Sequence, residues 1–282
     1  MPKGSIGDRA LGMRLRRFRE RAGVSLEYVA EVIDWSASKL SRFERGQTPE
    51  VTSEEVSAIL GVLRVHGHER AETLKMLTSK ADQGVWEDHD ADLTDQTRTY
   101  LALEPKATRL IFVQPFLVPG LLQTSEYCRI LFQTFGLDQA RLHGRMARRL
   151  GRQEILSRRN PPDVLFIVNE HTLRQPFGTH LLMAQQVRRI IEEAARPHVS
   201  VRVVPETVVA HPGLFGGFAI LEFADEPSIV YIEGRMSGLF PENPKEVADY
   251  ILAAKGQADL ALDEHGSLEL MHVVVEYLER AR

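Results

Sequence analysis

The chain has 282 residues, of which 43% are hydrophobic and 26% charged, which is enough for two domains with apolar cores. Its one cysteine, Cys128, excludes a disulfide framework and a cysteine-based zinc site, and favours a reducing, cytoplasmic location. The sequence contains no N-terminal apolar signal and no apolar run long enough to span a bilayer, so export and membrane insertion are not expected.

Charge is distributed unevenly along the chain, although the net charge is only −4. Six arginines and a single acid, Glu20, lie between Arg9 and Arg21, whereas all the charged residues from Glu87 to Asp95 are acidic. A basic N-terminal segment suits the phosphates of DNA whatever the total charge, because phosphates respond to the local field.

The segment from Val24 to Gly46 has the pattern of two short helices joined by a tight turn. Ser25 and Ser36 each precede an apolar periodic run, where a serine can accept a hydrogen bond from a free N–H of the first helical turn. Asp34 lies in the turn between the helices. The second helix carries small polar and basic side chains away from its apolar stripe, a face that suits the major groove of DNA.

The DNA-binding residues expected on this basis lie on the second helix and on the basic segment before it. Ala37, Ser38 and Arg42 are expected at base edges, with Arg42 the best candidate for a guanine contact. For Arg16, Arg17 and Arg45, phosphate contact and ordinary solvation are equally compatible with the sequence. The whole set comprises Ser36, Ala37, Ser38, Lys39, Ser41, Arg42, Arg45, Arg16 and Arg17.

The same segment resembles the helix-turn-helix of the Xre (lambda-repressor-like) class of transcription regulators. The matching positions are Val29-Ala30, Trp35-Ser36, Ser38, Leu40-Ser41-Arg42, Glu44 and Gly46. Two positions depart from the class. Leu26 stands where the class often has a glutamine that contacts phosphate, and Asp34 replaces the usual turn glycine, although aspartate tolerates left-handed backbone better than most residues. The resemblance implies that Arg19 and Glu44 form a structural ion pair rather than contacts to DNA.

Further apolar periodicity predicts an all-α N-terminal domain of about five helices over residues 1–83. A first helix is expected over 11–22, before the motif. Thr52 or Ser53 is expected to cap the helix that follows the motif. A last helix is expected over 68–80.

Residues 84–282 are expected to form a second domain of the α/β class. Between Trp86 and Ile111 the pattern indicates a helix that runs into an extended segment. The other expected helices cover 124–131, 137–158, 180–195, 245–262 and 267–282, and the expected strands cover 164–168, 199–204, 218–223 and 229–233. Gly213, Gly216 and Gly217 are assigned to a hairpin rather than to a mobile lid.

This second half resembles the C-terminal domain of unknown function found in actinobacterial regulators of the WhiJ-like type. The matching motifs are Trp86, Leu103-Glu104 with Ala107, Val118 to Thr124 with Tyr127, Arg149 with Arg152-Gln153, Glu170 with Leu173-Arg174, Val201 to Pro205, and Tyr231 with Glu233. The run VPGLLQTSEY, residues 118–127, is the most specific of them. The resemblance implies a developmental or antibiotic-related transcription regulator, often working with a small acidic partner protein.

The C-terminal half contains only fragments of the constellation that an enzyme needs. Glu170 and Glu233 lie at the ends of expected strands, where α/β proteins gather functional groups. The sequence has no phosphate-binding loop, no nucleophile elbow and no paired histidines at metal spacing, so no catalytic residue, cofactor or metal is expected. The candidate ligand or partner residues are Arg149, Arg152, Glu170, Arg174 and Glu233.

Arginines also recur along the helix expected over 137–158 and just beyond it. They are compatible with a solvated helix face, or with a site for an anion or an acidic partner, because guanidinium groups bind carboxylates in a fork geometry. This arginine stripe comprises Arg141, Arg145, Arg148, Arg149, Arg152, Arg158 and Arg159.

The sequence as a whole predicts a sequence-specific transcription regulator that binds double-stranded operator DNA and is not an enzyme. One short recognition helix makes few contacts, so a homodimer on two half-sites is expected, joined through the C-terminal domain. That domain is also expected to sense a small molecule or a small protein. The alternative is a helix-turn-helix protein with a catalytic or antitoxin-type C-terminal domain, in which mutation of Glu170 or Glu233 abolishes turnover.

Overall fold

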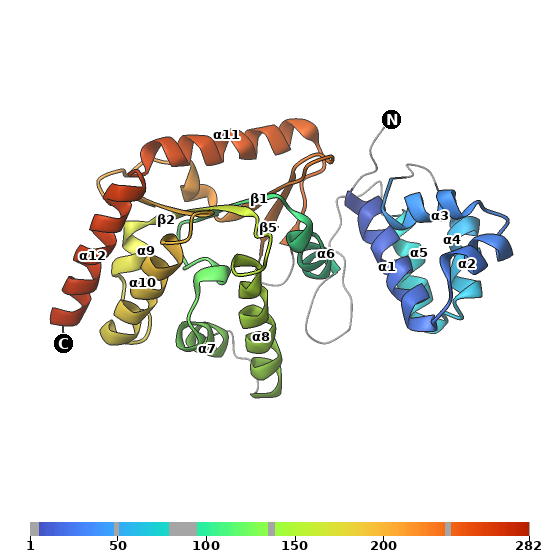
Figure 1. Cartoon of the computed structure of the whole chain (residues 1–282), viewed down its shortest axis with the longest axis horizontal. Helices are drawn as coiled ribbons and strands as arrows, with labels where there is room; N and C mark the ends of the chain where they lie inside the picture. The colour runs from blue at the N-terminus through green and yellow to red at the C-terminus, as the bar shows by residue number, and fades with distance from the viewer. Residues whose placement is uncertain (1–5, 48–50, 79–94, 135–138, 235–237, 282) are drawn as a thin grey trace. The chain divides into compact units, whose positions relative to one another are not determined.

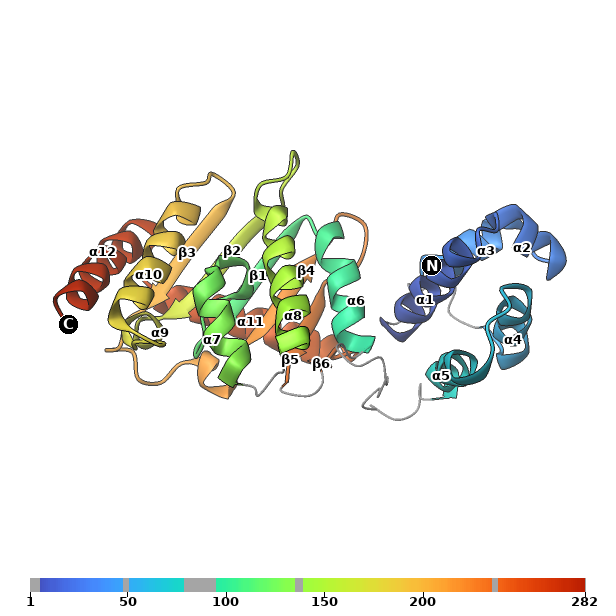
Figure 2. The same ribbon diagram turned by 90° about the horizontal axis from the view of Figure 1, so that it is seen from below.

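The computed structural model describes residues 6–47, 51–78, 95–134, 139–234 and 238–281. The chain divides into two compact units, Met1–Tyr100 and Leu101–Arg282. The boundary expected after residue 83 lies outside the described residues, as does Trp86. Figures 1 and 2 show the helices and strands of each unit. No helix within the described ranges is both long and apolar enough to cross a membrane.

The first unit contains a bundle of helices, as the sequence predicts. They are α1 (Ile6–Ala22), α2 (Leu26–Val32), α3 (Ala37–Glu44), α4 (Ser53–Val62) and α5 (Gly67–Thr78). Leu15 of α1, Phe43 of α3 and Leu60 of α4 meet in one core that is closed to solvent. Each helix therefore buries a single apolar stripe and leaves its other side to solvent. Residues 79–80 of the expected last helix lie outside the described ranges.

Local signals in the sequence fix the ends of these helices. The side chains of Ser25 and Ser36 each accept a hydrogen bond, at 3.1 Å, from the backbone N–H three residues later. Thr52 and Glu55 form a reciprocal capping box at the start of α4. Asp34 has φ 55°, in the left-handed region that the turn requires. The predicted caps are therefore confirmed.

Two glycines allow α1 and the end of α3 to approach closely. A Cβ atom on Gly12 would lie 2.3 Å from the carbonyl oxygen of Phe43, and one on Gly46 would lie 2.4 Å from Cα of Arg9. Gly46 also has φ 67°, which favours glycine. The orientation of α3 on the bundle therefore depends on these two positions.

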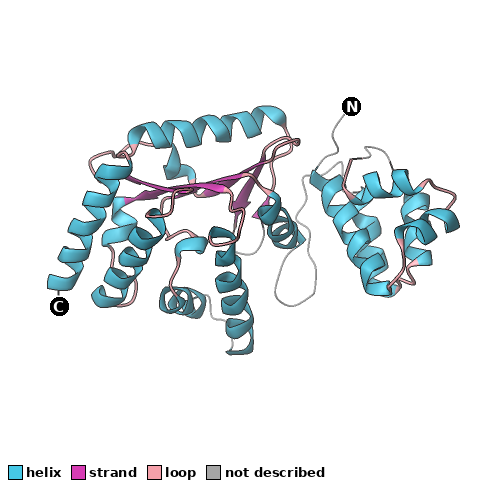
Figure 3. Ribbon diagram, in the orientation of Figure 1, coloured by secondary structure: helices cyan, strands magenta, loops and turns pink. Residues whose placement is uncertain are grey.

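The second unit is a mixed sheet with helices on both of its faces, which confirms the α/β prediction. Its strands are β1 (Arg109–Gln114), β2 (Asp163–Asn169), β3 (Val199–Val204), β4 (Phe218–Glu222), β5 (Ile229–Glu233) and β6 (Gly238–Leu239), in the order β3-β2-β1-β4-β5-β6. Strands β1, β2 and β3 are parallel, and β4, β5 and β6 are joined by antiparallel pairing. Figure 3 shows the sheet edge-on between its helices.

The helices of the second unit lie before, between and after its strands. They are α6 (Asp95–Leu103), which begins in the first unit, α7 (Ser125–Thr134), α8 (Gln139–Arg152), α9 (Glu170–Arg174), α10 (His180–Ala194), α11 (Pro244–Leu260) and α12 (Glu264–Arg280). Helix α11 covers one face of the sheet, and α7, α8 and α10 lie on the other (Figure 1). Ile111 and Ile167 pack toward α11, whereas Phe112 and Phe166 stack on the opposite face with centroids 5.2 Å apart.

The outer edge of β3 is closed by the segment that leads into α12. The backbone N–H of Val203 donates to Ser267 Oγ at 2.9 Å, and the N–H of Leu262 donates to the Val203 carbonyl at 2.9 Å. These bonds use strand groups that would otherwise be free to pair with another chain.

Two predictions about the second unit are wrong. The helix expected over 137–158 ends at Arg152, because the chain tightens into a 3-10 turn, η4 (Gln153–Leu156), that buries Ile155 and Leu156. The glycine-rich segment is not a hairpin. It contains a 3-10 turn, η5 (Pro212–Phe215), in a crossover between β3 and β4, which are separated in the sheet by β2 and β1.

Candidate DNA interface and the C-terminal polar network

Helix α3 presents a short polar surface to solvent. Ser36, Ser38, Arg42 and Arg45 are exposed, whereas Ala37 and Ser41 are only partly exposed. Neither Ser38 nor Arg42 makes a side-chain hydrogen bond or ion pair with any residue that the structure describes. Arg45 Nε donates to the Ser41 carbonyl at 3.1 Å. Ser38 and Arg42 thus retain their full hydrogen-bonding capacity for another molecule.

Lys39, another residue expected at the DNA surface, contacts its own domain. Its Nζ lies 2.8 Å from Glu55 Oε1 and 3.7 Å from the centroid of the Trp35 ring. The hydrogen bond from Lys39, followed by that from the Thr52 backbone, lowers the pKa of Glu55. Lys39 therefore links the start of α3 to α4.

Arg19 and Glu44 form a bidentate ion pair between α1 and α3. Arg19 Nε and Nη2 donate to the two carboxylate oxygens of Glu44 at 2.6 and 2.8 Å, and Nη1 donates to the Val24 carbonyl at 3.3 Å. The side chains are 13% and 6% exposed. The hydrogen bond to Glu44 raises the pKa of Arg19. The pair fixes the end of the recognition helix to the scaffold.

The arginines of α1 are less available to DNA than their number suggests. Arg9 and Arg14 are buried, and Arg14 Nε donates to Thr73 Oγ1 at 3.0 Å. Arg16 is exposed and pairs with Glu20 at 2.8 Å, which lowers the pKa of that carboxyl. Arg17 is exposed. Of this helix, Arg16 and Arg17 are the predicted phosphate contacts, and both reach solvent.

In the second unit, Arg149 and Arg152 are directed toward their own domain. Arg152 makes a bidentate pair with Glu104, at 2.8 and 2.7 Å, and the Glu104 side chain is only 2% exposed. Arg149 Nη1 donates to Gln123 Oε1 at 3.0 Å. A Cβ atom on Gly120 would lie 2.6 Å from Arg149 Nη1, so this glycine leaves room for the guanidinium.

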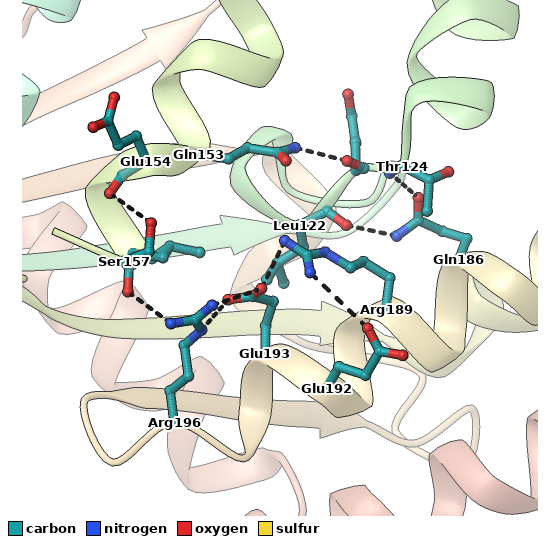
Figure 4. A network of polar contacts seen from close by, with 12 residues as sticks. Leu122, Thr124, Gln153, Glu154, Ser157, Gln186, Arg189, Glu192, Glu193 and Arg196 are labelled. Carbon is teal, nitrogen blue, oxygen red and sulfur yellow. Dashed lines mark hydrogen bonds and ion pairs between the residues drawn. The ribbon is translucent and has the colours of Figure 1, made fainter.

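The VPGLLQTSEY run is the other half of this arrangement. Its middle forms a 3-10 turn, η3 (Gly120–Leu122), whose backbone is bound by buried amides (Figure 4). Gln186 accepts from the Thr124 N–H and donates to the Leu122 carbonyl, both at 2.7 Å. Gln153 Nε2 donates to the Gln123 carbonyl at 2.6 Å. The two motifs therefore contact each other directly, through Gln153 on the backbone of Gln123 and Arg149 on its side chain, and α10 adds Gln186.

Figure 4 also shows Glu193 between two arginines of the same region. Its carboxylate, 2% exposed, lies 2.6 Å from Arg189 and 2.7 Å from Arg196. A buried carboxylate of this kind is stable only when paired. The network therefore stabilises the connection from α10 to β3.

Glu170, Arg174 and Glu233 do not form a common site. Glu170 accepts from Arg174 Nε at 2.6 Å and from the Glu206 N–H at 3.0 Å. Glu233 is exposed at the end of β5, and β1 and β4 separate that strand from β2. Three strand spacings correspond to about 14 Å. Within the described part of the chain, no three His, Cys, Asp or Glu side chains gather as a metal site.

The sequence did not reveal the partners of Arg149 and Arg152. Glu104 and Gln123 lie within motifs that the sequence shows, but their spacing along the chain does not reveal which side chain they meet. Gln186, fully buried, carried no signal beyond its place in an amphipathic helix. A buried polar residue in an apolar stripe is the signal that could have found it, because such a group requires a partner.

Comparison with known families gives two matches. A family model described as a helix-turn-helix domain matches residues 10–73, which contain α2, α3 and α4 and most of α1 and α5. A second model, described as a domain of unknown function (DUF5753), matches residues 97–272, which contain the whole sheet. No curated protein matches the chain. No solved structure matches it either.

Proposed function

Because the chain belongs to the DUF5753 family and carries a helix-turn-helix domain before it, we propose that it is a sequence-specific DNA-binding transcription regulator. The observation that carries the proposal is the exposed side of α3, where Ser38 and Arg42 have no partner among the described residues. A planar guanidinium at this position can donate two hydrogen bonds to a guanine edge in the major groove. Arg16, Arg17 and Arg45 supply phosphate contacts, which set affinity rather than sequence preference.

Selection of bound duplexes from a random pool tests this proposal. The full chain is expected to select one motif and to lose affinity steeply as salt rises. Arg42→Ala is expected to flatten the preference at one base pair of each half-site, a loss of roughly 1–3 kcal/mol of discrimination. Arg280→Ala removes the same charge from an exposed position on α12 and serves as the matched control. An unchanged motif for Arg42→Ala would refute α3 as the reading helix.

We also propose that the chain acts as a homodimer joined through the C-terminal unit. One short recognition helix makes too few contacts with DNA for the affinity of a regulator. Two N-terminal units, bound to half-sites about one helical turn apart, together make enough contacts. Sedimentation equilibrium of the full chain, with and without its selected duplex, measures the stoichiometry. A monomer that binds a single half-site tightly contradicts this part of the proposal.

In this proposal the C-terminal unit is a sensing domain without catalytic activity. The resemblance to WhiJ-like regulators supports a small-molecule effector or a small acidic protein as its signal. Arg149 and Arg152 are poor probes of such a partner, because both are engaged inside the domain. Arg159 is exposed beyond η4, so Arg159→Glu is the appropriate charge reversal. Capture of the acidic partner is expected to weaken in this variant and to remain with Arg280→Glu.

A further inference from the structure

Helix α11 packs one side on the sheet and turns its other side to solvent (Figure 1). Its Ala254 and Gln257 are buried, whereas Leu252 is 67% exposed. Residues three, four and seven positions apart share one side of a helix, so the outer residues form a single stripe. All are exposed except Gly256, which is partly exposed. This α11 stripe comprises Lys245, Ala248, Asp249, Leu252, Lys255, Gly256 and Asp259.

The charged side chains of the α11 stripe make no hydrogen bond or ion pair with any residue that the structure describes. They are Lys245, Asp249, Lys255 and Asp259. Arg280 of α12, by contrast, is also exposed but pairs with Glu276. The stripe therefore carries two cations and two carboxylates whose hydrogen-bonding capacity is unused within the chain.

The order of residues along the α11 stripe is complementary about Leu252. Asp249 and Lys255 lie three positions before and after it. Ala248 and Gly256 lie four positions away on each side, and Lys245 and Asp259 lie seven positions away. Each residue thus has a counterpart of opposite charge, or of equally small size, at the same distance beyond Leu252. Two identical helices that pair antiparallel about a twofold axis at Leu252 bring each residue to its counterpart in the other copy.

Charge separates this antiparallel pairing from a parallel one. In the antiparallel pair, Asp249 of one copy lies opposite Lys255 of the other, and Lys245 lies opposite Asp259, so four ion pairs form. A parallel pair about the same stripe sets each residue opposite itself, and all four charged positions then meet a like charge. Because like charges in contact are unfavourable, the stripe favours the antiparallel arrangement.

Small residues beside Leu252 allow two such helices to approach closely. Ala248 of one copy lies opposite Gly256 of the other. A Cβ atom on Gly256 would lie 3.7 Å from Cγ of Pro212, an ordinary contact, so none of the described residues requires a glycine there. Glycine inside a helix is destabilising relative to alanine. A close neighbour from a second copy accounts for its presence.

The turn η5 borders the α11 stripe and adds apolar surface to it. The Gly213 N–H donates to Gln257 Oε1 at 3.0 Å, and Pro212 lies beside Gly256. Leu214 and Phe215, the last residues of η5, are 55% and 99% exposed. Exposed apolar side chains that lie together within a charged rim are typical of protein–protein contacts.

We propose that the α11 stripe is the surface through which two copies of this chain form an antiparallel, twofold-symmetric dimer. The inference rests on the homodimer of the proposed function and names its interface. Leu252 packs against its own copy at the centre, and the ion pairs form the rim. One helix pair is a small interface, so a monomer–dimer equilibrium on the order of micromolar concentration is expected. Two half-sites on one duplex then strengthen the dimer by raising the effective concentration.

Sedimentation equilibrium of the full chain without DNA tests the interface. Leu252→Glu is expected to raise the dimer Kd by roughly a hundredfold, because a carboxylate then enters the centre of the contact twice. Leu181→Glu changes a leucine of similar exposure, 62%, at the start of α10 and is the matched control, with the Kd of the parent. A parent that stays monomeric at every attainable concentration, or a parental Kd in Leu252→Glu, overturns the proposal.

A charge exchange tests the antiparallel pairing. Asp249→Lys and Lys255→Glu are each expected to weaken the dimer about tenfold, because each change sets like charges opposite one another twice. The double variant restores opposite charges, and its Kd is expected within about threefold of the parent. A double variant that is weaker than either single one refutes the pairing.

An introduced cysteine reports the register, because the one native cysteine, Cys128, is fully buried. In the Leu252→Cys variant the new thiol lies opposite its own copy, and mild oxidation is expected to link the dimer, since Cα atoms within about 7 Å can be bridged. In Ala248→Cys, one turn away, the thiol lies opposite Gly256 and little linkage is expected. Linkage of Ala248→Cys but not of Leu252→Cys overturns the proposed register.

The same protein preparations separate this inference from the proposed function. A chain that selects a DNA motif and stays dimeric after Leu252→Glu overturns the α11 interface alone. A dimer that follows these substitutions, in a chain that selects no DNA motif, overturns the proposed function and leaves the interface in place.

Discussion

Helices α3 and α8 both carry arginines on a polar face, but the two faces have opposite environments. Arg42 on α3 is exposed and has no partner within the described residues, whereas Arg149 and Arg152 on α8 bind Gln123 and Glu104. The difference lies in what surrounds each helix. No acceptor among the described residues reaches Arg42, while the loop before α7 and the turn after α6 bring acceptors to α8. An arginine-rich face is therefore a ligand surface only where the fold leaves its donors unused.

The largest effect is expected at the Arg152–Glu104 pair. Glu104→Ala removes the bidentate carboxylate partner of the partly buried Arg152 guanidinium, and the free energy of unfolding of the C-terminal unit is expected to fall by roughly 3–5 kcal/mol. Arg152→Met combined with Glu104→Leu is expected to recover part of the loss, because neither charge then has to be buried. Urea unfolding followed by circular dichroism measures both. An unchanged unfolding midpoint for Glu104→Ala would mean that the arginines of α8, like Arg42 on α3, are not held by their own domain.

The second largest loss of stability is expected at the Arg19–Glu44 pair, the bidentate ion pair of the first unit. Glu44→Ala leaves Arg19 with a single carbonyl partner, and unfolding is expected to become easier by about 2–3 kcal/mol, since Arg19 keeps some exposure to water. Fluorescence of Trp35, which packs against Phe43 at 5.7 Å, follows thermal unfolding of this unit. Glu20→Gln removes the exposed partner of Arg16 and is the control, with an expected change below about 0.5 kcal/mol.

The third largest loss of stability is expected in the amide network around the VPGLLQTSEY run. Gln186→Leu keeps the shape of a fully buried side chain but leaves the Thr124 N–H and the Leu122 carbonyl without their partner. A loss of roughly 1–3 kcal/mol in unfolding free energy is expected, with faster amide exchange at Thr124. Slow exchange at Thr124 in this variant would show that another group holds the loop.

The smallest effect is expected at the Lys39–Glu55 pair and depends on pH. The pKa of Glu55 is lowered in the folded chain, so its contribution is fully present above the unfolded-state pKa of 4.5 and is lost as pH falls through the lower folded-state value. Both side chains are partly exposed, so the contribution is about 0.5 kcal/mol. Unfolding of the parent and of Lys39→Met at neutral and acid pH measures it. An equal difference at both pH values would contradict the assignment.

The sequence by itself determined the elements that depend on near neighbours. The caps at Ser25, Ser36 and Thr52 were predictable because the bonded groups lie three residues apart. Strand β3 was predicted with its observed bounds because a short apolar run after a proline is a local pattern. The Arg19–Glu44 pair followed from a resemblance, since nothing local links residues of α1 and α3.

Only the tertiary structure decided which polar groups are used up inside the fold and which are left for ligands. Arg152 and Arg42 look alike in sequence, and they differ because Glu104, far away in the chain, is brought to one and not to the other. Long-range contacts set these outcomes, because a side chain's partners depend on packing rather than on spacing along the chain.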